Sequence, residues 1–212
     1  MLNIDIVADF VCPWCFIGKR RLETAIATIR REQPEAQINT RWRPFFLNPD
    51  TPAGGEPYLP FLEHKFGSME AVNALFERVR AGGRAYGVDF AFERISLRAN
   101  TLLAHRLVQW AQRYGDADAL VERLFVAQFQ RGEAIGDPDV LTGIAGECGY
   151  PVAAWIAWRD AGSDTEGVRA DERRLRSLGI RMVPTYIVDG TQLIAGAEDP
   201  GILAAAMRAR LA

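Results

Sequence analysis

The sequence predicts an α/β protein in which both ends of the chain build one sheet and a block of helices interrupts it. Alternating apolar residues near the N-terminus indicate a strand that leads into a helix, and apolar residues at helical spacing dominate the middle of the chain. Strand and hairpin signals return near the C-terminus. Because neither flank could bury a sheet alone, we expect the two flanks to share one.

The N-terminal flank has the pattern of a strand, a helix and a second strand. Apolar and polar residues alternate over residues 2–9, and apolar residues recur at helical spacing over 22–29. Pro13 suits the first turn of this helix, where its missing N–H group costs nothing, so Cys12 is expected at the helix N-terminus. A strand follows at about residues 37–43.

The middle of the chain is predicted to be helical. A stretch rich in proline and glycine, residues 44–60, ends the first unit, and neither a helix nor a strand is expected to persist through it. Helical patterns then cover residues 103–110, 121–129 and 141–148, with Asp137-Pro138 as the cap and first turn of the last one. A polar helix is expected from about Ser163 to Leu178.

The C-terminal flank shows a hairpin and a helix. Residues 185–188 and 191–195 have strand composition, and Asp189-Gly190 between them is typical of a tight hairpin turn. Asp199-Pro200 then caps a terminal helix that has Leu203, Met207 and Leu211 on its inner face. Residues 1–47 and 179–212 are therefore predicted to form one discontinuous domain, and residues 58–178 a helical insertion domain.

Composition narrows the class of function. Of the 212 residues, 49% are hydrophobic and 25% are charged, so the chain can bury a core, and a net charge of −2 provides no global field for nucleic acid. No apolar run approaches the roughly 18 to 20 residues of a membrane helix. The N-terminus lacks the pattern of a signal peptide, and we expect a cytoplasmic protein.

The motif Cys12-Pro13-Trp14-Cys15 carries the chemistry. A Cys-x-x-Cys pair that follows a strand and opens a helix is typical of redox sites. Free N–H groups and the helix dipole stabilise a thiolate at Cys12, which is therefore assigned as the nucleophile. Cys15, one turn further, is placed to resolve a mixed disulfide by attacking Cys12.

Two plainer interpretations of the pair stay open. A zinc half-site would need two more ligands, and Cys148, His64 and His105 offer no second close pair, so no metal is expected. The cysteines could also be inert core residues, which would leave Pro13-Trp14 unexplained. Cys148 shares an apolar helix face and is predicted to pack in the core. His105 is expected to be a surface or hydrogen-bonded helix residue rather than a base.

Other catalytic motifs fail. The glycine spacing of Gly82 to Gly87 matches a phosphate-binding loop, but Val88 and Asp89 stand where lysine and serine or threonine would be needed. The sequence contains no Gly-x-Ser-x-Gly and no His-Glu-x-x-His.

Taken together, the strand, the Cys-Pro-Trp-Cys helix, the helical insertion and Met182-Val183-Pro184-Thr185-Tyr186 before a hairpin resemble the DsbA-like oxidoreductases. The resemblance implies a thioredoxin-like sheet with a large all-helical insertion. Residues 9–18 are particularly similar to the FrnE-like branch, which is grouped with 2-hydroxychromene-2-carboxylate isomerases and kappa-class glutathione transferases. The predicted insertion also resembles that branch at Asn100-Thr101 and Ala104-His105-Arg106, and no role is assigned to these residues.

The resemblance further implies that the Val183–Pro184 bond is cis and faces the cysteine pair. A cis bond would let Val183 offer its backbone N–H and C=O groups to an extended substrate. Substrate is accordingly expected to contact Pro13, Trp14, Val183 and Pro184.

Glutathione binding is a second implication. Asn48, Val183 and Asp199 resemble the glutathione-binding pattern of the glutathione-using relatives, and a helix N-terminus can hold the carboxylate of the tripeptide. The plainer alternative is that Asn48 begins a turn and Asp199 is only a helix cap. Both interpretations stay open.

The leading prediction is a thiol–disulfide oxidoreductase acting on a protein or small-molecule disulfide or dithiol, with glutathione or another small thiol as co-substrate and no tightly bound cofactor. Trp14 stands where strongly oxidising relatives have histidine, so the potential is expected between roughly −270 and −120 mV. The alternative is a glutathione-dependent isomerase or transferase. No nucleic acid or membrane partner is expected, and the related branch contains homodimers.

Overall fold

In the computed structural model, which describes residues 1–211 apart from the side chain of Gln192, the two flanks of the chain share one sheet. Its strand order is β2-β1-β5-β6. The strands are β1 (Leu2–Ala8), β2 (Ile38–Pro44), β5 (Thr185–Val188) and β6 (Gln192–Ala195). N-terminal β1 runs parallel to β2 and antiparallel to C-terminal β5, with Ile4 opposite Val188. The predicted fold class is therefore confirmed.

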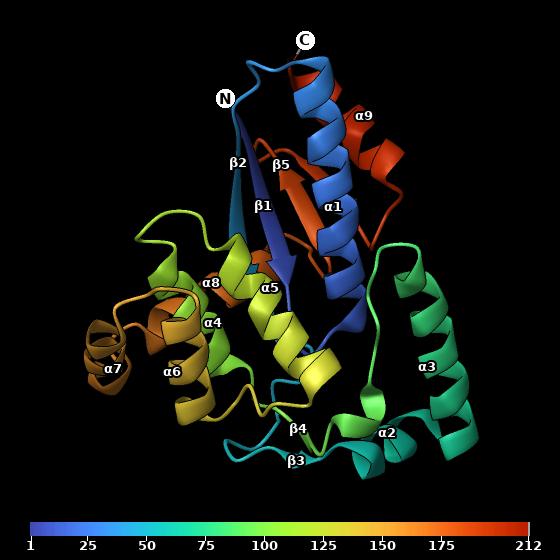
Figure 1. The fold of residues 1–212 in the computed structure, drawn as a ribbon, viewed down its shortest axis with the longest axis vertical. Helices are drawn as coiled ribbons and strands as arrows, with labels where there is room; N and C mark the ends of the chain where they lie inside the picture. The colour runs from blue at the N-terminus through green and yellow to red at the C-terminus, as the bar shows by residue number, and fades with distance from the viewer. Residues whose placement is uncertain (212) are drawn as a thin grey trace.

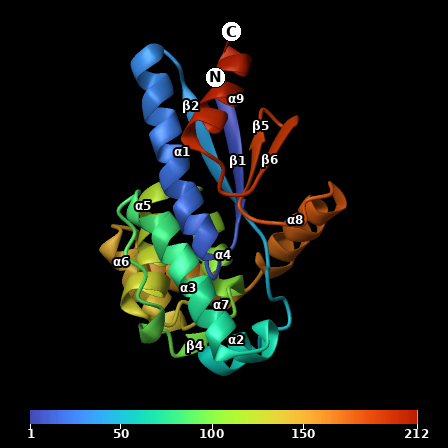
Figure 2. The same ribbon diagram turned by 90° about the vertical axis from the view of Figure 1, so that its right-hand side faces the viewer.

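Helices cover both faces of this sheet. Helices α1 (Pro13–Glu32) and α9 (Pro200–Leu211) share a core with the apolar residues of β1 that point to one face, such as Ile4 and Ile6. On the other face Val7 packs with Leu175 of α8 (Thr165–Ser177). Figure 2 shows α1 and α8 on opposite sides of the strands. The predicted polar helix thus belongs to the core of the sheet, although it lies within the range predicted as the insertion.

The β5–β6 hairpin has the turn that its sequence indicates. Asp189 and Gly190 have φ angles of 47° and 70°. Two successive residues with positive φ are the mark of the two-residue turn that matches the twist of the strands. Asp189 Oδ1 also accepts the backbone N–H of Asn3 at 2.9 Å, which ties the turn to the first strand.

The insertion lies beyond the end of β1 that leads into α1 (Figure 1). Its helices are α2 (Tyr58–Phe66), α3 (Met69–Arg84), α4 (Leu102–Ala111), α5 (Asp118–Val126), α6 (Pro138–Glu147) and α7 (Val152–Ala161). Two short segments, η1 (Phe92–Arg94) and the π-helical η2 (Ala127–Arg131), and two short paired strands, β3 (Glu56–Pro57) and β4 (Leu97–Arg98), complete it. The helical spacing predicted to reach residue 129 therefore changes its period after Val126.

No helix or strand persists through residues 44–60, as predicted, but two elements begin at the C-terminal end of this stretch. Strand β3 pairs there with β4, and α2 begins at Tyr58 although Pro60 follows two residues later. Proline is tolerated in a first helical turn because the N–H group it lacks would have no partner inside the helix. Prolines in this stretch therefore mark a helix start as well as a loop.

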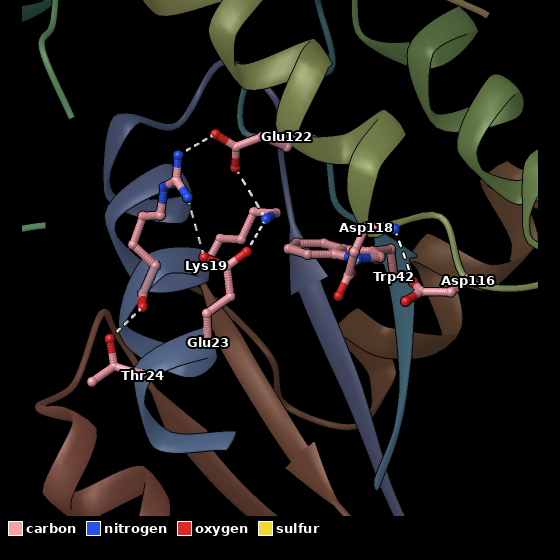
Figure 3. Close-up of polar contacts among 8 residues, drawn as sticks. Lys19, Glu23, Thr24, Trp42, Asp116, Asp118 and Glu122 are labelled. Carbon is pink, nitrogen blue, oxygen red and sulfur yellow. Dashed lines mark hydrogen bonds and ion pairs between the residues drawn. The ribbon is translucent and has the colours of Figure 1, made fainter. Parts of the chain in front are cut away.

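Ionic and polar contacts join the insertion to the sheet domain (Figure 3). Lys19 of α1 is only 4% exposed, and its ammonium lies between Glu23 of the same helix and Glu122 of α5, 3.0 Å from the latter. Trp42 of β2 donates its indole N–H to Asp118 of α5 at 2.6 Å. The Lys19 contact holds α5 against the N-terminal half of α1, and the Trp42 contact holds it against β2.

Candidate functional site

The turn from β1 into α1 places Cys12 at the helix N-terminus, as predicted. Cys12 is the N-cap, with extended backbone angles (φ −97°, ψ 110°), and Pro13 takes the first helical position. The Cys12 N–H donates to Asp9 O at 3.1 Å, and the Cys15 N–H donates to Cys12 O at 3.0 Å. Cys12 therefore lies at the positive end of the helix dipole.

The two thiols are free and have different surroundings. Cys12 is 5% exposed and lines a pocket, whereas Cys15 is 1% exposed and lies behind it. Burial, with the neighbouring Cys12 thiol, raises the pKa of the Cys15 thiol well above its ordinary value. Cys12 is thus the thiol that a substrate can reach, and Cys15 is held protonated beneath it.

The segment before β5 faces the cysteine pair. The Val183–Pro184 peptide bond is cis, as the family resemblance implies, and Val183 O lies 3.7 Å from Cys12 Sγ. The ring of Pro184 lies over Gly18 of α1, where an added Cβ would stand 2.7 Å from Pro184 Cγ. A residue with no side chain in α1 therefore allows this segment to approach the cysteines.

Trp14 lies against a second glycine. A Cβ on Gly82 of α3 would stand 3.1 Å from the Trp14 ring and 3.4 Å from Ile17. Of the two glycines whose spacing resembles a phosphate-binding loop, Gly82 is part of α3, whereas Gly87 lies beyond the end of that helix with a φ of 68°. Gly82 allows α3 to pack closely against Trp14, within the dipeptide between the two cysteines.

The pocket next to Cys12 has a volume of about 340 Å³. Its walls are mostly apolar and come from α2, α3 and the cysteine turn, including Trp14, Tyr58, Phe61, Phe66, Leu75, Phe76 and Val79. Three cations, Lys65, Arg98 and Arg181, also line it. The cavity can accept an apolar group directly beside the nucleophilic sulfur.

The structure brings most of the predicted site residues together. Pro13, Trp14 and Val183 line the pocket with Cys12, and so does Asn48, whose side-chain oxygen accepts from Lys65 at 3.2 Å. Asp199 is not among the lining residues, and its carboxylate accepts the Gly201 N–H at 2.7 Å as a helix cap does. Of the glutathione-type residues, Asn48 and Val183 therefore share the site with Cys12.

A buried acid and histidine were not assigned from the sequence. Asp9 and His105 are 1% and 5% exposed, and Asp9 Oδ1 lies 3.5 Å from His105 Nε2. Asp9 Oδ2 accepts the Leu47 N–H at 2.8 Å, which fixes the start of the loop after β2. His105 packs between Phe10 and Phe46 within α4, so of its two predicted positions, a surface or a hydrogen-bonded helix residue, the surface one is wrong. The sequence signal that could have found this pair is the position of Asp9, three residues before Cys12.

The remaining candidates lie elsewhere. Cys148 ends α6, is partly buried beside the core as its helix face predicts, and does not line the pocket. His64 is exposed on α2. Asn100 bonds the Thr51 carbonyl and the Leu102 N–H, which identifies it as a structural residue at the start of α4. Within residues 1–211, no group of three or more His, Cys, Asp or Glu side chains is placed to hold a metal ion.

The buried Cys15 thiol predicts a pH dependence of stability. In the unfolded reduced chain this thiol loses its proton near about pH 8.5, whereas the folded protein retains it because burial raises the pKa. The contribution of the protonated Cys15 thiol to the free energy of unfolding is fully present below that pH and is lost as the pH rises. Under reductant, we expect the wild type to lose about 1 kcal/mol per pH unit more than Cys15→Ser above about pH 9. Urea denaturation between about pH 8 and 10 measures this, and equal slopes would contradict it.

The sequence and the structure of the chain are both similar to those of known proteins. A family model described as the DSBA-like thioredoxin domain matches residues 3–208. The chain belongs to the DsbA-like thioredoxin family. Along its whole length this DsbA-like protein is similar to the crystal structure of a probable DsbA oxidoreductase from Streptomyces coelicolor, at 28% identity over 100% of this chain and 90% of that one, with a TM-score of 0.86.

Two other solved structures share the fold of this DsbA-like protein. The cytosolic disulfide reductase DsbM from Pseudomonas aeruginosa, solved with GSH, is 18% identical over 99% of this chain and 98% of that one, with a TM-score of 0.66. A 2-hydroxychromene-2-carboxylate isomerase is 15% identical over 99% and 95%, with a TM-score of 0.65. No helix in residues 1–211 combines the length and apolar character needed to cross a membrane.

Proposed function

We propose that this DsbA-like protein is a thiol–disulfide oxidoreductase that uses Cys12 and Cys15. The observation that carries the proposal is the unequal placement of the two thiols. Cys12 lines an open pocket at a helix N-terminus, while Cys15 lies directly behind it with no access to that pocket. A nucleophile that meets substrate and a second thiol that meets only the nucleophile are the two parts that disulfide exchange requires.

The reaction follows from these positions. The Cys12 thiolate attacks one sulfur of a substrate disulfide, a Cys12–substrate disulfide forms, and the other substrate sulfur leaves as a thiolate. Cys15 then loses its proton to solvent and attacks Cys12 Sγ, which releases the second substrate thiolate and leaves a Cys12–Cys15 disulfide. The substrate gains two electrons and the protein loses two, and the reverse sequence oxidises a dithiol.

Val183 supports the first step. Its carbonyl lies 3.7 Å from Cys12 Sγ, so a group bound to that sulfur passes alongside the Val183 backbone. A substrate chain that pairs with this backbone, as an added strand pairs with a sheet edge, would be aligned for attack.

Alkylation mass spectrometry after equilibration with glutathione redox buffers tests the proposal. We expect Cys12 and Cys15 to become protected together in one two-electron transition while Cys148 stays independent, with a midpoint between roughly −270 and −120 mV. A midpoint outside this interval would reject the assigned potential. Two thiols that remain reduced in every buffer would reject the redox function.

The glutathione-dependent isomerase or transferase is the second candidate, and it is favoured by one observation. Asn48 and Val183 line the same pocket as Cys12, so a glutathione held by them would lie beside that sulfur. This reaction would not use Cys15. A glutathione adduct on Cys12 that persists without an internal disulfide, with turnover intact in Cys15→Ser, would replace the first proposal with the second.

A further inference from the structure

The pocket beside Cys12 is positively charged in a chain whose net charge is −2. Lys65, Arg98 and Arg181 line it, and no Asp or Glu occurs among the described residues of its lining. The rest of the pocket is largely apolar, and charges at an apolar wall are screened less than charges in open water. The local potential therefore favours an anion, opposite to what the net charge predicts.

Two of these cations are not neutralised. The Lys65 ammonium lies 3.2 Å from the amide oxygen of Asn48 and 5.4 Å from the centre of the Phe61 ring, and neither group carries a full negative charge. Arg181 donates to the backbone carbonyls of Arg176 and Ile180. Within residues 1–211, neither Lys65 nor Arg181 forms an ion pair with a carboxylate. Each can therefore pair with a ligand.

Arg98 is the buried member of the set. It is 7% exposed, and its guanidinium stacks on the Phe61 ring at 3.6 Å while pairing with Glu56. Its Nε is buried and has no hydrogen-bond partner in the structure. A buried donor without a partner is costly unless a ligand or water satisfies it.

The apolar wall indicates the body of the ligand. Phe61, Phe76 and Trp14 offer aromatic surface within a volume of about 340 Å³, near the lower end of small-molecule sites, which run from about 300 to 1,000 Å³. A cavity of this size suits one or two rings. It holds little of a folded protein, which would have to present a single apolar side chain to reach Cys12.

We infer that the pocket binds a low-molecular-weight disulfide, or the corresponding thiol, that has an aromatic body and an acidic group. The aromatic body lies against the apolar wall, the acidic group meets Lys65 and Arg181, and one sulfur reaches Cys12. This inference rests on the proposed function and adds to it the chemical class of the substrate.

The exchange balances without a further reagent. The Cys12 thiolate takes one aromatic thiol into a mixed disulfide and releases the other as a thiolate, and Cys15 then displaces the first. One acidic aromatic disulfide and the reduced protein thus give two aromatic thiolates, two protons and the Cys12–Cys15 disulfide.

Stopped-flow oxidation of the reduced protein tests the inference, in a Cys148→Ser background so that one dithiol reacts. The acidic probe is 5,5′-dithiobis(2-nitrobenzoate), and the neutral aromatic probe is 2,2′-dithiodipyridine. We expect Lys65→Met to lower the rate of oxidation by the acidic probe about fivefold or more and to reduce the salt dependence of that rate. The rate of oxidation by the neutral probe is expected to change by less than about twofold. Comparing each probe only with itself removes differences in intrinsic reactivity.

Arg30→Gln is the matched control. Arg30 is an exposed cation at the far end of α1, outside the pocket, and its loss changes the net charge by the same amount. Equal effects of Lys65→Met and Arg30→Gln on the acidic probe would overturn the inference, because they would reveal a global rather than a local charge effect. Equal slowing of both probes by Lys65→Met would overturn it as well.

A pocket-filling variant tests the aromatic body. Leu75 is half-buried in the wall, and Leu75→Trp is expected to slow both aromatic probes while 2-hydroxyethyl disulfide, which is small and neutral, reacts as before. If this variant does not fold, Leu75→Phe replaces it. Unchanged rates for all probes would overturn the substrate class.

The two proposals fail in different ways. If 2-hydroxyethyl disulfide does not convert Cys12 and Cys15 into an internal disulfide, the proposed function itself is wrong. If it does so, and Lys65→Met has no selective effect on the acidic probe, only the inferred substrate class is wrong.

Discussion

Cys12→Ser is expected to abolish disulfide exchange, with a loss of about a thousandfold or more in rate. A hydroxyl at this position cannot form the mixed disulfide, and Cys15 cannot replace Cys12 because it is 1% exposed and does not line the pocket. Its pKa, raised by burial, also keeps it from being a thiolate at neutral pH. The measurement is the rate of oxidation by 2-hydroxyethyl disulfide, followed by loss of free thiol.

Cys148→Ser is the control for this variant. Cys148 is a partly buried thiol at the end of α6 and takes no part in the pocket, so its loss is expected to leave the rate within about twofold of the wild type. Cys15→Ser should separate the two steps, since the mixed disulfide forms on Cys12 and then persists. Residual exchange in Cys12→Ser near the wild-type rate would show that another thiol is the nucleophile.

The second large effect is expected on stability. Gly18→Ala would place a Cβ 2.7 Å from Pro184 Cγ and in collision with the Tyr186 hydroxyl, and both neighbours belong to the buried segment that faces the cysteines. Overpacking of this kind costs about 1 to 3 kcal/mol, more than the gain of alanine over glycine in a helix. Urea denaturation should show a lower free energy of unfolding, together with slower disulfide exchange as Pro184 moves away from Cys12.

Gly143→Ala is its counterpart in α6. An added Cβ at that helical glycine meets nothing within 4 Å, so the same substitution is expected to stabilise the protein by about 0.5 to 1 kcal/mol. Equal changes for Gly18 and Gly143 would contradict the close approach of Pro184 to α1.

The nucleophilic motif and much of the fold follow from local patterns. Alternation over Leu2–Ala8 and the Asp189-Gly190 turn indicate the strands, and Pro13 indicates the helix start at Cys12. Each of these signals acts within a few residues of chain, where backbone sterics and side-chain periodicity decide the conformation. The position of Cys12 at a helix N-terminus needs no long-range information.

Several parts of the site depend on contacts between distant segments. Gly82 receives Trp14 from a helix nearly seventy positions away in the chain, and Lys65 and Arg181 reach one pocket from different elements. His105 is a polar residue in an amphipathic helix, a pattern equally typical of a surface position, and only the packing of Phe10 and Phe46 buries it beside Asp9.

The position of Cys12 and Cys15 at the start of a helix that follows a strand is predictable from the sequence, because strand alternation and a proline in the first helical turn are local signals. Which residues surround Cys12 depends on the tertiary structure. Helices α2 and α3 and the segment before Pro184 pack around Cys12 because apolar surfaces of elements far apart in the chain are buried together. Apolar burial is non-directional, so it leaves no local sequence pattern that would predict this arrangement.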